Sequence, residues 1–267
     1  MSRVYGGAAT TNMTRPERAS RNAFVAVSAL LFAGSAAVTI AWCVSMTDMD
    51  GMQMPGGWTM SMAWMRMPGQ TWLDAAASFL AMWVVMMVAM MLPSVAPMLW
   101  RYRNAVRSVP LTVLAAVAYF LVWTVIGLVA FPVGVALAAV EMRSPALASA
   151  VPIAAAVVVL IAGAVQLTAW KARRLACCAQ GPARALRAEQ STAWRHGLRL
   201  GLRCSACCAN LTAILFAIGV MDPWAMAIVT VAITLERLAP AQLHIARVIG
   251  GVAVAGGLAL IAQAVAL

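Results

Sequence analysis

The chain has 267 residues, of which 64% are hydrophobic and only 10% are charged, and its formal net charge is +11. Soluble domains carry about 25% charged residues, so this composition excludes an ordinary soluble protein and is typical of a membrane protein. We therefore predict an all-α fold, in the form of a polytopic helical bundle embedded in a membrane.

Seven apolar segments approach the length of about 20 residues with which a helix crosses the hydrocarbon core. We predict that they form one transmembrane domain over residues 23–267, after a basic cytoplasmic tail at residues 1–22. The sixth segment is short for a span. In chain order the segments are Ala23–Val44, Ala75–Met98, Val109–Phe131 with an extension to Val140, Val151–Trp170, Cys204–Val220, Pro223–Ala239 and Ile245–Ala266.

The basic residues predict the orientation of these spans. With the N-terminus in the cytoplasm, 17 of the 19 basic residues fall on the inner side, and only Arg66 and Arg143 fall outside. The C-terminus is then outside, and the expected location is the inner membrane of a bacterium. The positive charge faces anionic lipid headgroups, so the bilayer is the expected partner and nucleic acid is not.

The outer loop at residues 45–74 is rich in methionine. Thioether sulfur is a soft ligand that suits Cu(I), and it forms no disulfides in an oxidising compartment. Packing of the loop against the membrane is the alternative, but residues 46–67 contain no Leu, Val or Ile. The eight methionines of this segment are Met46, Met49, Met52, Met54, Met60, Met62, Met65 and Met67.

The second predicted span carries further methionines at helical spacing. Met82, Met86 and Met90 share one face of a helix, and Met87 and Met91 form an adjacent stripe. A row of sulfur atoms leading inward from the outer loop would provide a path for a soft metal. A stripe that faces lipid or packs in the core is the alternative. Prolines 93 and 97 predict a kink near the inner end of this helix.

Five of the six cysteines fall on the predicted inner side. Cys204, Cys207 and Cys208 open the fifth span, and Cys177 and Cys178 end the fourth, with the basic loop 171–203 between them. Disulfides are a poor explanation in a reducing cytoplasm, whereas thiolates select Cu(I) or, as the less favoured choice here, zinc. Close helix packing by small residues is the alternative.

Several other polar residues lie in or near the spans. Gln166, Asn210 and Thr212 could link helices or orient ligands, and Glu236–Arg237 is expected to form a local ion pair. Cys43 could be a ligand or a packing residue, and His196 is expected to be an interfacial histidine. The sequence contains no set of residues typical of a catalytic site, so we do not expect an enzyme.

Four parts of the chain carry a resemblance to a known family. They are the stretch 81–98, the pair Lys171 and Cys178, the run 197–208 that ends in Cys-Ser-Ala-Cys-Cys, and the stretch 216–221 followed by 224–226. They resemble the bacterial family of predicted metal-binding integral membrane proteins, which are described as copper-chaperone-like. That family has Cys-x-Gly-Cys-Cys-Trp where this chain has Ala206 and Ala209. The resemblance implies a metal-binding role.

Together these patterns predict a protein that captures Cu(I) at the outer methionines and passes it toward the inner cysteines, or in the reverse direction. A membrane or periplasmic protein is the expected protein partner. One alternative is a structural subunit of a larger membrane complex, for which the glycine-rich stretch 250–257 would offer a packing face. A membrane thiol redox protein is another.

Overall fold

The computed structural model describes residues 15–47, 51–179 and 188–266. Residues 1–14 of the predicted tail and Met49 lie outside the described residues. The described part consists of helices and one small hairpin: α1 (Arg15–Thr47), β1 (Met52–Met54), β2 (Trp58–Met60), the 3-10 turn η1 (Met62–Trp64), α2 (Trp72–Val106), α3 (Val109–Arg143), α4 (Pro145–Gln166), α5 (Ala169–Ala179), α6 (Gln190–Ile218), α7 (Pro223–Leu238) and α8 (Gln242–Ala266).

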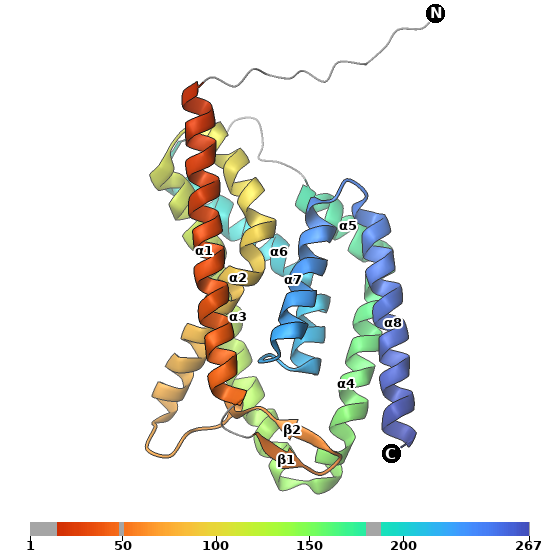
Figure 1. The fold of residues 1–267 in the computed structure, drawn as a ribbon. Coiled ribbons are helices and arrows are strands. Elements are labelled where there is room, and N and C mark those ends of the chain that lie inside the picture. The colour runs from red at the N-terminus through yellow and green to blue at the C-terminus, as the bar shows by residue number, and fades with distance from the viewer. Residues whose placement is uncertain (1–14, 48–50, 180–187, 267) are drawn as a thin grey trace, which may run out of the picture.

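Six of these helices, namely α1, α2, α3, α4, α6 and α8, are long and apolar enough to cross a membrane. This agrees with the predicted all-α membrane bundle. The remaining predicted segment, the sixth in chain order, is α7, whose 16 residues extend only about 24 Å. It returns between α6 and α8, and the turn before it stops short of the β hairpin (Figure 1).

The loops sort to the two ends of the bundle (Figure 1). The start of α1, the α2–α3 turn, α5 and the α7–α8 turn lie at one end, which we call the inner end after the predicted orientation. The hairpin, the α3–α4 turn and the end of α8 lie at the other, which we call the outer end. The orientation in the membrane itself stays a prediction.

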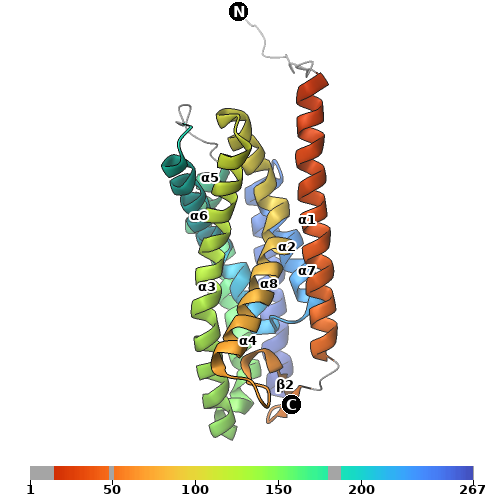
Figure 2. The same cartoon turned by 90° about the vertical axis from the view of Figure 1, so that its left-hand side faces the viewer.

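Helix α1 lies at the edge of the bundle, beside α2 (Figure 2). Near its inner end, Phe24 packs on Trp100 with the ring centroids 5.2 Å apart, and the Arg103 guanidinium lies over both rings. Two cavities of about 520 and 700 Å³ border the same half of α1. Side chains such as Leu30 are exposed, as expected for a helix in contact with lipid.

The prediction of a long inner loop over residues 171–203 is wrong. Helix α5 occupies its beginning, and α6 begins at Gln190 rather than at Cys204. The basic first half of α6 packs on α3 through glycine. A Cβ on Gly197 would lie 2.2 Å from the carbonyl oxygen of Ala115, so only glycine permits this approach.

The glycine-rich stretch of α8 packs within the chain. Cβ atoms on Gly250 and Gly257 would lie 2.8 Å from atoms of Gln166 and Leu160 in α4. Two of the glycines that were predicted to pack against a partner helix therefore pack against α4 of the same chain. The opposite glycines, Gly251 and Gly256, have open space around them.

The methionine-rich outer segment folds into a hairpin that the sequence did not predict. Strands β1 and β2 are antiparallel, with Met52 opposite Met60. The turn between them uses Gly56 and Gly57, which have φ of 97° and 74°, a conformation that favours glycine. The Trp58 Nε1 donates to the carbonyl of Ala148 at 2.8 Å, which fastens the hairpin to α4.

Candidate metal centre

The methionines of α2 point into the bundle. Thr71 and Asp74 form a capping box that begins α2, and the helix then buries its sulfur-bearing face. The predicted alternative of a lipid-facing stripe is therefore wrong, whereas packing and a metal path both fit. The exposed fractions are Met82 3%, Met86 1%, Met87 0%, Met90 3% and Met91 0%.

The sulfur row extends beyond Met91 toward the inner end. Helix α2 continues through Pro93 and Pro97 to Val106. The fully buried Ser94 donates to the carbonyl of Met91 at 2.9 Å. One turn further on, the Met98 sulfur accepts a hydrogen bond from the Arg237 guanidinium at 3.2 Å. Met98 thus joins the methionines of α2 to the cysteine region, a role that the sequence analysis did not assign to it.

Four of the five predicted inner cysteines come together, and all six cysteines of the chain are free thiols. Cys204 and Cys208 lie one turn apart on α6, with their sulfur atoms separated by 3.9 Å. Cys207 precedes Cys208 and is fully buried, and Cys178 of α5 donates to the carbonyl of Arg203, next to Cys204, at 3.4 Å. We call Cys178, Cys204, Cys207 and Cys208 the inner thiol cluster.

The thiols do not form a closed cage. Among the described residues, no group of three or more His, Cys, Asp or Glu side chains is arranged to hold a metal ion. The pair Cys204 and Cys208 is closer to metal geometry. Two thiolates at about 2.3 Å from one ion lie at most about 4.6 Å apart, and the Cys204–Cys208 separation of 3.9 Å falls within that limit.

Two groups from other helices contact the sulfur of Cys204. The Tyr119 hydroxyl of α3 donates to it at 3.0 Å, and Arg237 Nη1 of α7 donates to it at 2.8 Å. The same Nη1 donates to Ser94 at 3.0 Å. Arg237 therefore does not form the predicted local pair with Glu236. The two side chains project to different neighbours from α7.

Glu236 instead pairs with Lys171 of α5, at 2.8 Å between Nζ and Oε2. Gln166 donates to the other carboxylate oxygen. The Lys171 ammonium also donates to the carbonyl of Cys207 at 2.7 Å and lies 3.5 Å from the Asn210 Oδ1. The three charged groups of this region are therefore two cations and one anion, which leaves one positive charge uncompensated by carboxylate.

The sequence analysis named these three charged residues but did not place them in one site with the cysteines. Lys171 is fully buried, and Glu236 and Arg237 are 1% and 4% exposed. Ionisable side chains within an apolar bundle are rare and mark functional sites. That signal was present in α7, but Lys171 had been counted among the basic residues of a loop.

The remaining predicted candidates have other surroundings. Cys177 is half-buried and is not part of the inner thiol cluster. His196 stacks on Tyr102 with the ring centroids 4.6 Å apart, which fits a packing role. Cys43 is 2% exposed and belongs to the main core.

The predicted outer methionines do not share one site. Met54 and Met60 are buried against Ala138 and Ala148 under the hairpin. Met52 is 42% exposed. Met46, at the end of α1, is half-buried, and the side chain of Met62 lies outside the described part of the structure.

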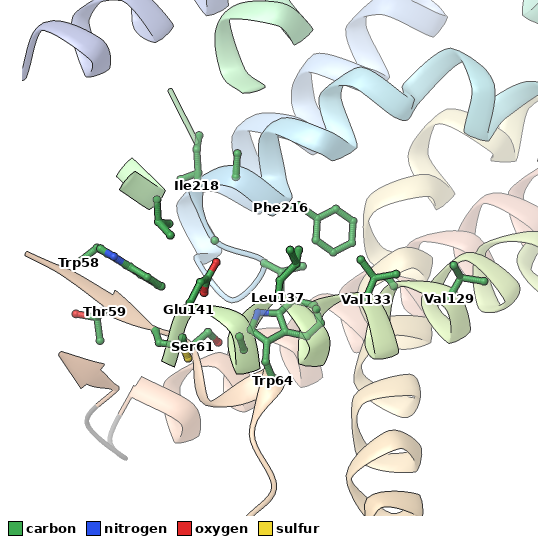
Figure 3. Close-up of a pocket in the computed structure, with 18 of the residues that line it drawn as sticks. Trp58, Thr59, Ser61, Trp64, Val129, Val133, Leu137, Glu141, Phe216 and Ile218 are labelled. Carbon is green, nitrogen blue, oxygen red and sulfur yellow. The ribbon is translucent and has the colours of Figure 1, made fainter. Parts of the chain in front are cut away.

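A cavity of about 720 Å³ lies between the hairpin, α3 and the α6–α7 turn (Figure 3). Trp58 comes from the hairpin, Val129, Val133 and Leu137 from α3, and Phe216 from the end of α6. Its donor set is poor for a soft metal, because Met60 is its one sulfur ligand among the described residues. The cavity is therefore not a candidate copper site.

A family model described as PpoB2, a copper chaperone, matches residues 80–260. The chain belongs to this copper-chaperone family. The match spans the inner thiol cluster, the buried ions and the methionines of α2, whereas the segment at residues 46–67 precedes it. The predicted family resemblance is confirmed, and with it a function related to copper. No curated protein and no solved structure matches the chain.

Proposed function

We propose that this protein is a non-catalytic copper carrier of the bacterial inner membrane that binds Cu(I) at the inner thiol cluster. The metal would arrive from the outer methionines along the buried sulfur row of α2. The observation that carries the proposal is the Cys204–Cys208 pair, 3.9 Å apart, beside a buried excess of one positive charge.

The charge balance favours Cu(I). Metal-binding thiols lose their protons, so two thiolates and one Cu(I) make a centre of net charge −1. The buried ions around the cluster, Lys171, Glu236 and Arg237, leave one positive charge. The two charges cancel when the ion is bound, and buried charge is tolerated where it is compensated.

Zinc fits this arrangement less well. Structural zinc sites are tetrahedral, with four ligands that close around the ion. In the inner thiol cluster, Cys204 and Cys208 contact each other, and no closed set of ligands is formed among the described residues. Cu(I) accepts soft sulfur ligands of both kinds present here, thiolate and thioether.

The sulfur row supplies a path. Met82, Met86 and Met90 lie on one face of α2 inside the bundle. Met98 lies about two turns after Met91 on α2 and shares the Arg237 guanidinium with Cys204. Because thioethers are neutral, a monovalent soft ion could move from one methionine to the next without a change in ligand charge. It would meet anionic ligands, the thiolates, only at the inner end.

Copper analysis of the purified protein tests the proposal. Cu(I) is added without oxygen, against a chelator of known affinity, and bound metal is measured by elemental analysis. We expect the Cys204→Ser/Cys208→Ser variant to lose the copper that is held at the inner thiol cluster. The matched control is Cys177→Ser, which removes a neighbouring thiol outside the inner thiol cluster and leaves that copper bound.

Two results would contradict the proposal. One is bound copper below about a tenth of an equivalent in the wild-type protein at saturating Cu(I). The other is an amount of bound copper that the double serine substitution does not change.

A further inference from the structure

A separate cavity at the outer end collects methionines from four parts of the chain. Its volume is about 270 Å³. We call it the outer methionine cavity, and five methionines line it: Met46, Met65, Met67, Met82 and Met221. Met46 ends α1, Met82 belongs to α2, and Met221 lies in the α6–α7 turn.

The backbone around this cavity is well fixed. The Met67 N–H donates to the Gln70 side chain at 3.3 Å, and the Gln70 N–H donates back to the Met67 carbonyl at 3.1 Å. Trp64 packs on Phe79 of α2, with the ring centroids 5.2 Å apart. Asp222 caps α7 directly after Met221. These contacts, together with Cys43 of α1, which is buried in the main core, hold the four segments in place, while the methionine side chains keep their own flexibility.

The chemistry of the cavity wall is selective for soft ions. Among the described residues, no charged side chain lines the cavity, and its polar side chains are Gln70 and Ser78 besides the Trp42 indole. Hard divalent cations such as Mg²⁺ and Ca²⁺ need several oxygen ligands, and a wall of neutral thioethers does not provide them. Cu(I) and Ag(I) accept such sulfur ligands.

The burial of the methionines places the cavity between solvent and the interior. Met46, Met65, Met67 and Met221 are half-buried, whereas Met82 is 3% exposed and begins the sulfur row of α2. A soft ion in the cavity is therefore next to the first sulfur of that row. The hairpin methionines Met52, Met54 and Met60 are not part of the lining.

We infer that the outer methionine cavity is a second Cu(I) site, with Met65, Met67 and Met221 as ligands in addition to Met46 and Met82. The inference deepens the proposed function and rests on its premise that the protein carries copper. Three of the five methionines precede residue 80, where the family match begins. The site is therefore a feature of this chain's own residues.

Two matched triple variants of the full-length protein test the inference. Met65→Leu/Met67→Leu/Met221→Leu removes three cavity sulfurs, and Met52→Leu/Met54→Leu/Met60→Leu removes three hairpin sulfurs. Replacement of Met by Leu conserves volume and costs less than about 1.5 kcal/mol at each site. We expect two equivalents of Cu(I) in the wild type and the hairpin variant, and one in the cavity variant.

The inner thiol cluster provides the cross-check. Cys204→Ser/Cys208→Ser should keep the equivalent held by the cavity and lose the other. A wild type with one equivalent, lost only on serine substitution, overturns the cavity site and leaves the proposed function intact. A wild type with one equivalent, lost only in the cavity variant, supports the cavity and contradicts the inner site. Equal loss in both triple variants, or loss in the hairpin variant alone, overturns the inference.

A measurement on the wild type guards against misfolded variants. Ag(I), which is stable in air, is added before mild oxidation by peroxide, and methionine sulfoxide is mapped by mass spectrometry. We expect Ag(I) to protect Met65, Met67 and Met221, while the exposed Met52 and Met142 are oxidised as before. Equal oxidation of all five methionines with and without Ag(I) would overturn the inference.

Discussion

The inner thiol cluster and the outer methionine cavity both gather sulfur, yet their surroundings differ. At the inner end, a lysine, a glutamate and an arginine are buried beside the thiols. At the outer end, neutral side chains line the cavity among the described residues. Thiols become anions when they bind metal, whereas thioethers stay neutral. In this protein, buried charged side chains thus lie beside the thiols, which become anionic on metal binding, and not beside the thioethers, which stay neutral.

The largest expected effect comes from the pair Lys171–Glu236. Glu236→Gln leaves the buried ammonium without its carboxylate, and we expect a loss of about 3–5 kcal/mol in stability. The thermal unfolding midpoint of the protein in detergent should fall steeply. The control is Glu141→Gln, which changes a carboxylate that lines the cavity of about 720 Å³ beside the hairpin. Lys171→Met/Glu236→Leu, which removes both charges, should recover much of the loss. If the midpoint of Lys171→Met/Glu236→Leu were as low as that of Glu236→Gln, the loss of stability would not come from the unpaired ammonium charge.

Arg237 tests the charge balance at the inner thiol cluster. Arg237→Gln removes the cation that contacts Cys204 and Met98. A hydrogen bond to a charged group is worth about 1.5–3 kcal/mol, so we expect inner-site Cu(I) affinity to fall about tenfold to a hundredfold. Chelator competition measures it, with the exposed Arg247→Gln as control. Occupancy of the outer methionine cavity should not change, and an unchanged inner affinity would refute the charge argument.

The methionines between the two regions have a smaller effect on stability. Met86→Leu/Met90→Leu preserves packing, so each substitution should cost less than about 1.5 kcal/mol. Because leucine has no sulfur, copper added to the outer face of proteoliposomes should reach the thiols more slowly. Protection of the cysteines from alkylation gives the time course, and the exposed Met142→Leu is the control. An undiminished rate would mean that the metal does not use this row.

The smallest effect is expected at His196, which stacks on Tyr102. His196→Phe keeps an aromatic ring in that stack, and the unfolding free energy should change by less than about 1 kcal/mol. Copper affinity at the inner thiol cluster should be unchanged, by the same chelator competition. A measurable fall would make His196 a ligand and would enlarge the inner site.

The sequence was sufficient for the fold class and for most helix positions. Long apolar runs fix the membrane helices because the bilayer demands length and internal hydrogen bonding. Hydropathy alone did not predict that α6 begins at Gln190, because the arginines in its first half are typical of a surface segment. Gly197 nevertheless lets this half of α6 pack closely on α3. Such an approach between helices distant in sequence is not visible in local hydropathy.

The candidate site was predicted in part. Cysteines one turn apart on a helix must share a face, so the meeting of Cys204 and Cys208 follows from spacing. The contacts of Cys204 with Tyr119 and Arg237 join three helices, and spacing alone cannot show them. Met221 was missed for the same reason, since a turn far along the chain brings it to the cavity.

The position of α1 has a geometric consequence for the outer end. Its ring contacts lie near Phe24, whereas Met46, about 33 Å further along the helix axis, forms part of the cavity wall. Between these two points Thr39 and Cys43 are 6% and 2% exposed, so α1 is packed into the bundle near Met46 as well as at Phe24. Anchored at both ends in this way, the helix keeps Met46 in its place in the cavity wall.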